Sequence, residues 1–193
     1  MKHIRAVFLD RDGTINEEVG YLNSLDKLVI FPEAFDAVKI LNRLGLKVIV
    51  ITNQSGVARG FFDEAFVRQV HDHIKHLFQA RGARLDDFYY CPHHPTEGQG
   101  PYLKKCACRK PEPGLLIKAA RKWGIALASS YMVGDQEKDI ELIKRVGGKG
   151  ILVATGYGSQ VTITKWEPDF RAPDLLEAAK WIERDLAHEH LPD

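Results

Sequence analysis

The feature that most limits how this chain can fold is a short apolar run near its start that ends at two carboxylates. Ile4 and the segment Ala6–Leu9 have the composition of a strand buried on both faces of a parallel sheet. Asp10 follows directly, and Asp12 lies two residues later. Since open α/β sheets bind ligands at the carboxyl ends of their strands, this position indicates a catalytic or binding site. The alternative at this point is a solvated Asp-Gly turn.

Strand and helix patterns alternate along the rest of the chain. Further buried strands are expected at residues 46–51, 88–90, 131–133 and 150–153. Amphipathic helices are expected between them, at about residues 32–44, 63–78, 113–123, 136–147 and 173–188. This alternation predicts right-handed crossovers and a parallel sheet in one Rossmann-like, three-layer α/β/α domain spanning residues 1–193. The spacings leave no room for a large cap domain, so we expect an open site.

Composition and charge exclude several classes of protein. With 45% hydrophobic and 27% charged residues, the chain has an ordinary globular composition, and 193 residues suffice for one well-buried domain. A net charge of +1 gives no electrostatic reason to expect nucleic acid or a membrane surface as partner. No apolar run reaches the roughly 20 residues that span a bilayer. Without a signal-peptide pattern, and with three cysteines that cannot all pair, we expect a cytoplasmic protein, by default a monomer.

Polar residues follow three of the expected strands. They are Asp10 and Asp12 after the first strand, Thr52 and Asn53 after the second, and Asp135 after the fourth. In a parallel sheet these strand ends share one edge, so the side chains should converge there. Because carboxylates alone would repel a phosphate ester, we expect Mg²⁺, which binds oxygen ligands and bridges to a phosphoryl oxygen. Lys110, which lies just before a helix, is the candidate cation for neutralising developing negative charge.

All three cysteines lie in one irregular stretch of the chain. The pattern is Cys91-x-His93, then twelve residues, then Cys106-x-Cys108. Thiolates and imidazole favour tetrahedral Zn²⁺, and four protein ligands make a closed structural site. His94 is the alternative fourth ligand, and unliganded buried cysteines are the alternative for the whole pattern. A zinc-binding loop over about residues 91–110 would hold Arg109 and Lys110 against the edge of the sheet where phosphate binds.

Four motifs, in chain order, resemble those of the haloacid dehalogenase superfamily of phosphohydrolases. They are Asp10-x-Asp12-Gly13-Thr14, Thr52-Asn53, Lys110 and Gly134-Asp135-x-x-x-Asp139. The resemblance covers nearly the whole chain and implies phosphoryl transfer in two steps. Asp10 would attack phosphorus to form an aspartyl-phosphate. Asp12 would protonate the leaving alkoxide and then deprotonate the water that hydrolyses the intermediate.

The same resemblance implies roles for the remaining motif residues. The Mg²⁺ ligands would be Asp10, the backbone carbonyl of Asp12, and Asp135. Thr52 and Lys110 would stabilise the transferring phosphoryl group. Asp139 would orient its loop rather than bind the metal directly.

The cysteine-rich loop narrows the resemblance to the branch of heptose-bisphosphate 7-phosphatases and histidinol-phosphate phosphatases. Its length favours the heptose enzymes, which implies removal of the C7 phosphate of D-glycero-D-manno-heptose 1,7-bisphosphate during synthesis of ADP-heptose and lipopolysaccharide core. Histidinol phosphate is the alternative substrate, and a zinc-stabilised, phosphate-binding regulatory module is the alternative that is not an enzyme. The predicted substrate contacts are Glu18, Val19, Gly20, Tyr21, Thr52, Asn53, Gln54, Ser55, Arg109, Lys110 and Gln136. Gln136 supplies no charge, whereas relatives often have lysine at this position.

Two further stretches are given no part in the chemistry. His71, His73 and His76 belong to one expected helix, and the first two point in different directions, so we expect them on a solvated face. Residues 155–158 follow the fifth strand and are expected to form a flexible loop.

Overall fold

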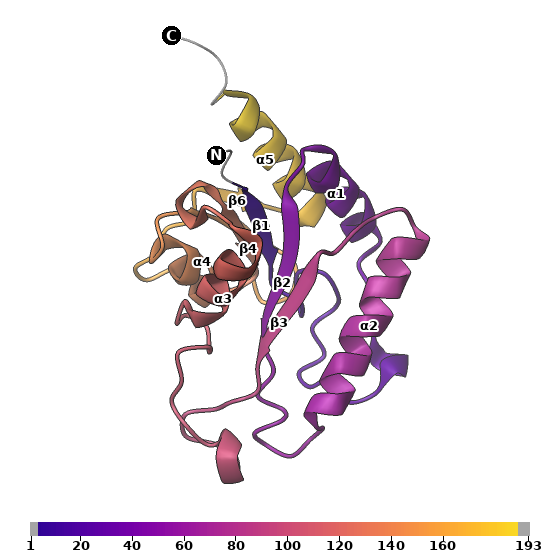
Figure 1. The fold of residues 1–193 in the computed structure, drawn as a ribbon, viewed down its shortest axis with the longest axis vertical. Coiled ribbons are helices and arrows are strands. Elements are labelled where there is room, and N and C mark those ends of the chain that lie inside the picture. Colours follow the sequence, from indigo (N-terminus) through magenta and orange to yellow (C-terminus); the bar gives the residue numbers. More distant parts are fainter. Residues whose placement is uncertain (1–3, 189–193) are drawn as a thin grey trace.

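In the computed structural model, which describes residues 4–188, the centre of the fold is a six-stranded parallel sheet (Figure 1). Its strand order is β3-β2-β1-β4-β5-β6. The strands are β1 (Ala6–Leu9), β2 (Lys47–Asn53), β3 (Asp87–Cys91), β4 (Tyr131–Gly134), β5 (Lys149–Val153) and β6 (Phe170–Ala172). The helices are α1 (Pro32–Arg43), α2 (Glu64–Ala80), α3 (Gly114–Trp123), α4 (Glu137–Lys144) and α5 (Leu175–His188). Short 3-10 turns lie at Leu25–Lys27, Gly100–Tyr102 and Leu127–Ser129.

Local signals in the sequence explain where the helices begin and end. α1 has Pro32 in its first turn, where the missing backbone N–H needs no partner. α2 is capped by Asp63, whose carboxylate accepts a hydrogen bond of 2.8 Å from Phe66 N. α3 ends at Gly124, whose φ of +66° closes the last turn. These helices therefore form where their local sequence predicts them.

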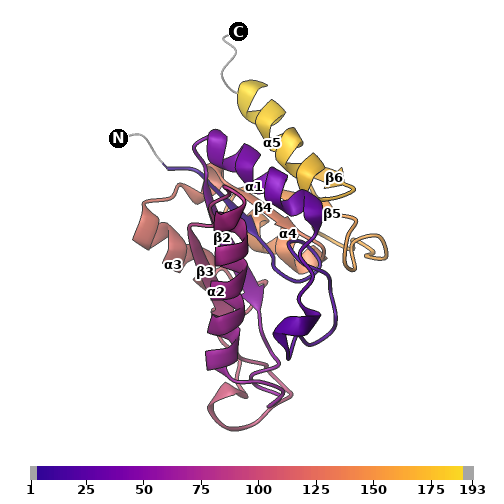
Figure 2. The same cartoon turned by 90° about the vertical axis from the view of Figure 1, so that its right-hand side faces the viewer.

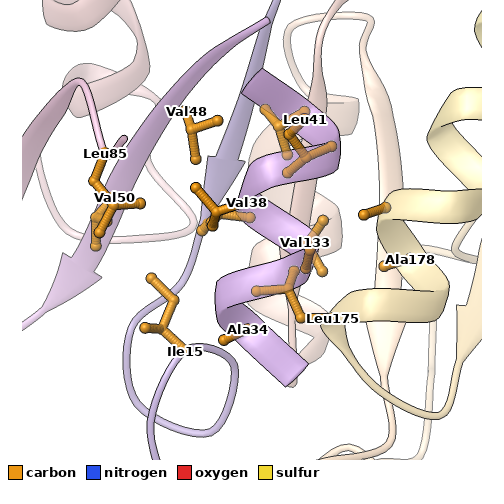
Figure 3. Close-up of a cluster of buried hydrophobic side chains, with 14 of the residues drawn as sticks. Ile15, Ala34, Val38, Leu41, Val48, Val50, Leu85, Val133, Leu175 and Ala178 are labelled. Atoms are coloured by element: carbon orange, nitrogen blue, oxygen red, sulfur yellow. The ribbon is translucent and has the colours of Figure 1, made fainter. Parts of the chain in front are cut away.

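The helices cover the sheet in two layers. α1, α2 and α5 lie on one face, and α3 and α4 lie on the other (Figures 1 and 2). Figure 3 shows Val38 of α1 directed toward β2, which carries Val48 and Val50. Because these side chains are fully buried, each contributes about 1.5–3 kcal/mol of burial free energy. Within the described residues, no helix is both long and apolar enough to cross a membrane.

The predicted fold class is confirmed, and the strands differ from the predicted ones at β3, β6 and β2. β3 includes Cys91, which therefore lies at the end of a strand rather than in the irregular stretch after it. β6, which the sequence pattern did not predict, pairs with β5 through Ile151 and Phe170. Its three residues are too few to show an alternating pattern, so only pairing with β5 defines it. β2 continues through Thr52 and Asn53, which therefore belong to the strand itself rather than to the loop after it.

The parallel arrangement brings the carboxyl ends of β1, β2, β4 and β5 to one edge of the sheet. β1 lies between β2 and β4, and Asp10 N extends the pairing with a hydrogen bond of 2.9 Å to Val133 O. Asp10 is thus held by the backbone of the neighbouring strand. The predicted site residues from β1, β2 and β4 all lie along this edge.

Candidate active site

Asp10 lies at the carboxyl end of β1 with only 5% of its surface exposed. Its Oδ1 lies 2.7 Å from Lys110 Nζ and accepts a hydrogen bond of 2.7 Å from Arg11 N. Burial raises the pKa of Asp10 to about 6. The positive charge of Lys110 lowers this pKa, and the negative charge of Asp139 partly cancels that effect. Within residues 4–188, Oδ2 has no hydrogen-bond partner, which leaves this oxygen available to a ligand.

Lys110 is buried at the centre of the site. Besides Asp10, its Nζ contacts Asp139 Oδ1 at 2.7 Å and donates a hydrogen bond of 3.1 Å to Ile51 O. Asn53 holds the backbone at this point, because Lys110 N donates to Asn53 Oδ1 at 3.0 Å and Asn53 Nδ2 donates to Lys110 O at 3.2 Å. Although burial lowers the pKa of Lys110, the two carboxylates raise it above its usual value. Lys110 is therefore charged and fixed beside Asp10.

Asp135 follows β4 and is completely buried. Its Oδ2 accepts a hydrogen bond of 2.9 Å from Tyr157 N, whereas its Oδ1 has no partner within the described residues. Burial, followed by the charges of Asp10 and Asp139, raises the pKa of Asp135 to about 7. Oxygens of these three carboxylates lie within 4.8 Å of one another. Three carboxylates beside one lysine, with a buried oxygen left unpaired, suit a hard cation such as Mg²⁺.

Asp139 lies in the first turn of α4 and serves two of the chain's own groups. Its Oδ1 pairs with Lys110 Nζ, and its Oδ2 accepts a hydrogen bond of 3.2 Å from Gln136 N. Both oxygens thus have partners within the chain. This geometry fits the prediction that Asp139 orients its surroundings rather than binding the metal.

Asp12 is held by donors on two sides. Arg11 Nε lies 3.0 Å from Asp12 Oδ1, and Arg11 Nη2 lies 2.8 Å from Oδ2. Asn16 Nδ2 donates to Oδ1 at 3.0 Å, and Gln54 Nε2 donates to Oδ2 at 2.9 Å. Burial raises the pKa of Asp12, but the Arg11 charge and these hydrogen bonds outweigh it and hold the pKa below its usual value. Gln54 Nε2 also donates to Thr52 Oγ1 at 2.9 Å, which links Asp12 to β2.

A cavity of about 230 Å³ opens beside Asp10. All the predicted substrate contacts except Val19 line it. The Glu18 carboxylate accepts a hydrogen bond from Gly20 N, and this tight turn leaves Val19 exposed to solvent. Other lining residues that the sequence did not indicate as contacts are Leu22, Gly56, Phe62, Lys138 and Tyr157.

The loop after β5 takes part in the site, so its expected lack of a role was wrong. Thr155 Oγ1 donates a hydrogen bond of 2.6 Å to Gly13 O, and Tyr157 N donates to Asp135 Oδ2. Gly156 between them approaches Asp135 so closely that a Cβ there would meet the carboxylate. The signal that could have found this loop is its position, since it follows a strand whose carboxyl end lies on the same edge.

The sulfur and nitrogen atoms of the predicted zinc loop come together. Cys91, Cys106 and Cys108 have their Sγ atoms 3.2–3.5 Å apart, and His93 Nδ1 lies 3.3 Å from Cys108 Sγ. His94 is not part of the cluster, because its Nδ1 accepts a hydrogen bond of 2.9 Å from Glu97 N. Thiols are weak hydrogen-bond partners for one another, so four such ligand atoms around a common point suit a soft tetrahedral cation.

The three histidines of α2 do not share one environment. His73 and His76 are exposed, as expected, whereas His71 is buried with 5% of its surface exposed. His71 Nε2 lies 3.3 Å from Arg11 Nη1. The solvated position expected for His71 was therefore wrong, because this residue lies on the face of α2 that packs against the sheet.

The parallel sheet and the buried carboxylates at the carboxyl ends of β1 and β4 are typical of a phosphohydrolase, and comparisons with known proteins give the family. Residues 107–178 match the family model described as "HAD-hyrolase-like". The chain is 37% identical over 186 residues, 96% of this chain and 92% of the relative, to D-glycero-beta-D-manno-heptose-1,7-bisphosphate 7-phosphatase of Escherichia coli (strain K12). It is 42% identical over 155 residues, 79% of this chain and 82% of the relative, to the enzyme of that name from Photorhabdus laumondii.

A solved structure gives the same result. D,D-heptose 1,7-bisphosphate phosphatase from B. bronchiseptica, complexed with magnesium and phosphate, matches with a TM-score of 0.81 and 31% identity. The match covers 94% of this chain and 99% of that one. The chain belongs to the D-glycero-beta-D-manno-heptose-1,7-bisphosphate 7-phosphatase family of HAD-like hydrolases. It is therefore a phosphoric monoester hydrolase.

Proposed function

We propose that this phosphatase removes the C7 phosphate of D-glycero-D-manno-heptose 1,7-bisphosphate, and so contributes to the synthesis of ADP-heptose and lipopolysaccharide-core precursors. The observation that carries the proposal is the convergence of Asp10, Lys110 and Asp135 at one edge of the sheet, in a chain whose relatives are named for this substrate. Reduced thiols in the zinc loop suit a cytoplasmic location.

In the first step Asp10 attacks phosphorus through Oδ2, the oxygen that the surrounding donors leave unpaired. A bond from Oδ2 to phosphorus forms while the bond from phosphorus to the C7 oxygen breaks. Lys110 offsets the negative charge of the reacting groups. Thr52 Oγ1 accepts its hydrogen bond from Gln54, so its own proton is free to be donated to a phosphoryl oxygen.

Asp12 transfers a proton in each of the two steps. The charge of an arriving phosphate raises the pKa of Asp12, so that it holds a proton and gives it to the leaving C7 alkoxide. In the second step the Asp12 carboxylate takes a proton from water, which attacks the aspartyl-phosphate and releases phosphate. Arg11 favours the carboxylate form that this second step needs.

Mg²⁺ would be held by Asp10, the backbone carbonyl of Asp12, and Asp135. The unpaired Asp135 Oδ1 and the buried cluster of negative charge support this assignment. When bound, the ion polarises a phosphoryl oxygen and offsets the repulsion between phosphate and carboxylates. Tyr157 N keeps Asp135 oriented, and Lys110 keeps Asp10 oriented.

The cavity supplies contacts for the part of the substrate that does not react. Arg109 and Lys138 place two cations on its lining, which suits the phosphate that remains on C1. Lys138 forms no ion pair with any described residue, and its charge offsets part of the rise in the pKa of Asp10 and Glu18. Lys138 thus supplies the charge that Gln136 lacks. The remaining contacts are proposed at Glu18, Gly20, Tyr21, Asn53, Gln54 and Ser55.

Zn²⁺ bound by Cys91, His93, Cys106 and Cys108 would give the loop its shape. Arg109 Nη1 donates a hydrogen bond of 3.0 Å to His93 O, which connects this cation to the ligand cluster. The zinc site is therefore structural, and it positions Arg109 and the following Lys110.

The test is phosphate release in Mg²⁺ from the α and β anomers of heptose 1,7-bisphosphate and from histidinol phosphate. We expect kcat/KM for one anomer to exceed that for histidinol phosphate by at least about 100-fold, because the cations of the cavity need the second phosphate. Asp10→Asn should abolish release, whereas Asp36→Asn on the exposed side of α1 should leave it unchanged. Preference for histidinol phosphate would overturn the substrate, and phosphate binding without turnover would favour a regulatory module.

A further inference from the structure

The three nitrogen atoms of the Arg11 guanidinium contact two other side chains. It is buried with 2% of its surface exposed, and its Nε and Nη2 hold the two oxygens of Asp12. Its remaining nitrogen, Nη1, lies 3.3 Å from His71 Nε2. Because the guanidinium is a rigid plane, a partner on Nη1 fixes the orientation of the two nitrogens that bind Asp12.

The His71 ring is itself fixed by β3. It stacks on Phe88, with ring centroids 4.9 Å apart and an interplanar angle of 24°, and it meets Tyr90 edge-on at 5.6 Å. Arg11 has only donor hydrogens, so His71 Nε2 must accept and the proton of the neutral ring lies on Nδ1. Burial and the Arg11 charge lower the pKa of His71 to about 3, which keeps the ring neutral and able to accept.

We propose that His71 is a positioning residue for the general acid and base: it accepts a hydrogen bond from Arg11 and thereby sets the plane in which Arg11 holds Asp12. The connection runs from the aromatic residues of β3, through His71 and Arg11, to the carboxylate at the end of β1. This inference rests on the role proposed above for Asp12. It gives a function to the one α2 histidine that is buried against the sheet.

A variant of His71 without a hydrogen-bond acceptor should change the orientation of Asp12 but should leave some of its hydrogen bonds in place. Arg11 Nη1 would be left buried and unpaired, so the guanidinium would turn toward another acceptor. Asn16 and Gln54 would still hold the carboxylate, each through one hydrogen bond. The loss should therefore be smaller than that caused by removing the Asp12 carboxylate, and it should be confined to steps in which Asp12 transfers a proton.

The experiment compares His71→Phe, which keeps the stack on Phe88 but has no acceptor, with His71→Gln, which keeps an acceptor. Each is assayed for kcat/KM on the sugar bisphosphate, whose alkoxide needs a proton, and on p-nitrophenyl phosphate, whose phenolate leaves without one. His71→Phe should lower kcat/KM for the sugar about 10- to 100-fold and for the aryl ester by no more than about threefold. KM for the sugar should stay unchanged, and His71→Gln should recover most of the rate.

His73→Phe, at an exposed position of the same helix, is the matched control and should behave like the wild type. Asp12→Asn gives the upper limit of the loss. Equal losses on both substrates, or no recovery with His71→Gln, would overturn the proposal, since a general loss of structure affects every substrate. Full activity of His71→Phe beside an inactive Asp12→Asn would overturn it and leave the proposed function intact. Full activity of Asp12→Asn on the sugar would overturn the proposed mechanism itself. If His71→Phe does not fold, His71→Met carries the same comparison.

Discussion

At the scale of single residues, Lys110 is the buried cation that compensates the charges of the neighbouring carboxylates. Its Nζ lies 2.7 Å from both Asp10 and Asp139, and all three side chains are buried. A buried ion pair adds little net stability, but removing one partner leaves a charge without compensation. Lys110 therefore matters to the folded state, in addition to its proposed role in phosphoryl transfer.

Without Mg²⁺, Lys110→Met should lower the free energy of unfolding by about 3–5 kcal/mol, because two buried carboxylates lose their cation. The double variant Lys110→Met/Asp139→Asn should recover part of this loss, although both variants should be inactive. Urea unfolding in Mg²⁺-free buffer without a chelator measures the difference. Lys122→Met, which breaks a largely exposed pair with Asp87, should cost less than about 1 kcal/mol. A double variant as unstable as the single one would contradict this explanation.

At the scale of elements, the loops after the strands complete the site. The loop after β5 binds Asp135 through Tyr157 N and binds the turn after β1 through Thr155 Oγ1. The loop can come this close only because Gly156, with a φ of +57°, has no side chain. Three strand ends thus cooperate in orienting one carboxylate.

Gly156→Ala should weaken Mg²⁺ binding about 10- to 100-fold, because the new Cβ would displace the oriented Asp135 carboxylate. Calorimetric titration with Mg²⁺ measures the affinity, and phosphate release measures the consequence. Gly82→Ala is the matched control, since Gly82 also has a positive φ, +74°, but lies in open space. Both variants carry the backbone strain, so similar Mg²⁺ affinities in the two would show that Gly156 has no special role.

The proposed zinc loop is the other element that carries residues of the candidate site. Arg109 and Lys110 come directly after the last cysteine of the cluster. Loss of the proposed zinc ion would therefore leave both cations without the support that holds them at the cavity. Catalysis should then respond to a change that lies outside the cavity.

Cys106→Ser should remove about one zinc ion per chain, as measured by mass spectrometry, and should raise KM while lowering kcat. His94→Ala, which leaves the ligand cluster intact, should retain the metal and serves as the control. The midpoint of thermal unfolding should fall only in the cysteine variant. A zinc-free Cys106→Ser with normal kinetics would separate the loop from the chemistry.

At the scale of the whole molecule, the sheet brings three buried carboxylates together at one edge, and a divalent cation would relieve the repulsion between them. Burial raises the pKa of Asp10 from 3.8 to about 6 and that of Asp135 from 3.8 to about 7 in the metal-free protein. Between about pH 4 and about pH 7, the folded state therefore binds more protons than the unfolded chain. By linkage, the contribution of these groups to stability is fully present below about pH 4 and is lost as the pH rises toward 7.

Asp135→Asn isolates this effect, because asparagine stays neutral throughout. In Mg²⁺-free buffer, the variant should gain stability relative to the wild type as the pH rises from about 4 to about 7, and urea unfolding across this range measures the difference. Saturating Mg²⁺ should reverse the order at neutral pH by stabilising only the wild type. A difference that does not change with pH in Mg²⁺-free buffer would show that burial does not raise the pKa of Asp135.

The sequence alone determined the parallel α/β fold, the order of its helices, and the strand ends at which Asp10, Thr52 and Asp135 lie. These features depend on local patterns: apolar runs define buried strands, residues such as Asp63 and Gly124 define helix ends, and parallel strands present their carboxyl ends on one edge. Four ordered motifs then sufficed to indicate the family. The cysteine pattern predicted a ligand cluster for the same reason, since its spacing is local.

Only the tertiary structure decided which residues from separate elements touch. β6 exists because β5 offers it a pairing partner, and its three residues show no pattern of their own. The loop after β5 reaches Asp135 because the sheet places β5 beside β4. His71 is buried rather than solvated because α2 packs this face against Phe88 and Arg11. Such contacts depend on how helices and strands pack across long sequence separations, and no periodicity within one segment can specify them.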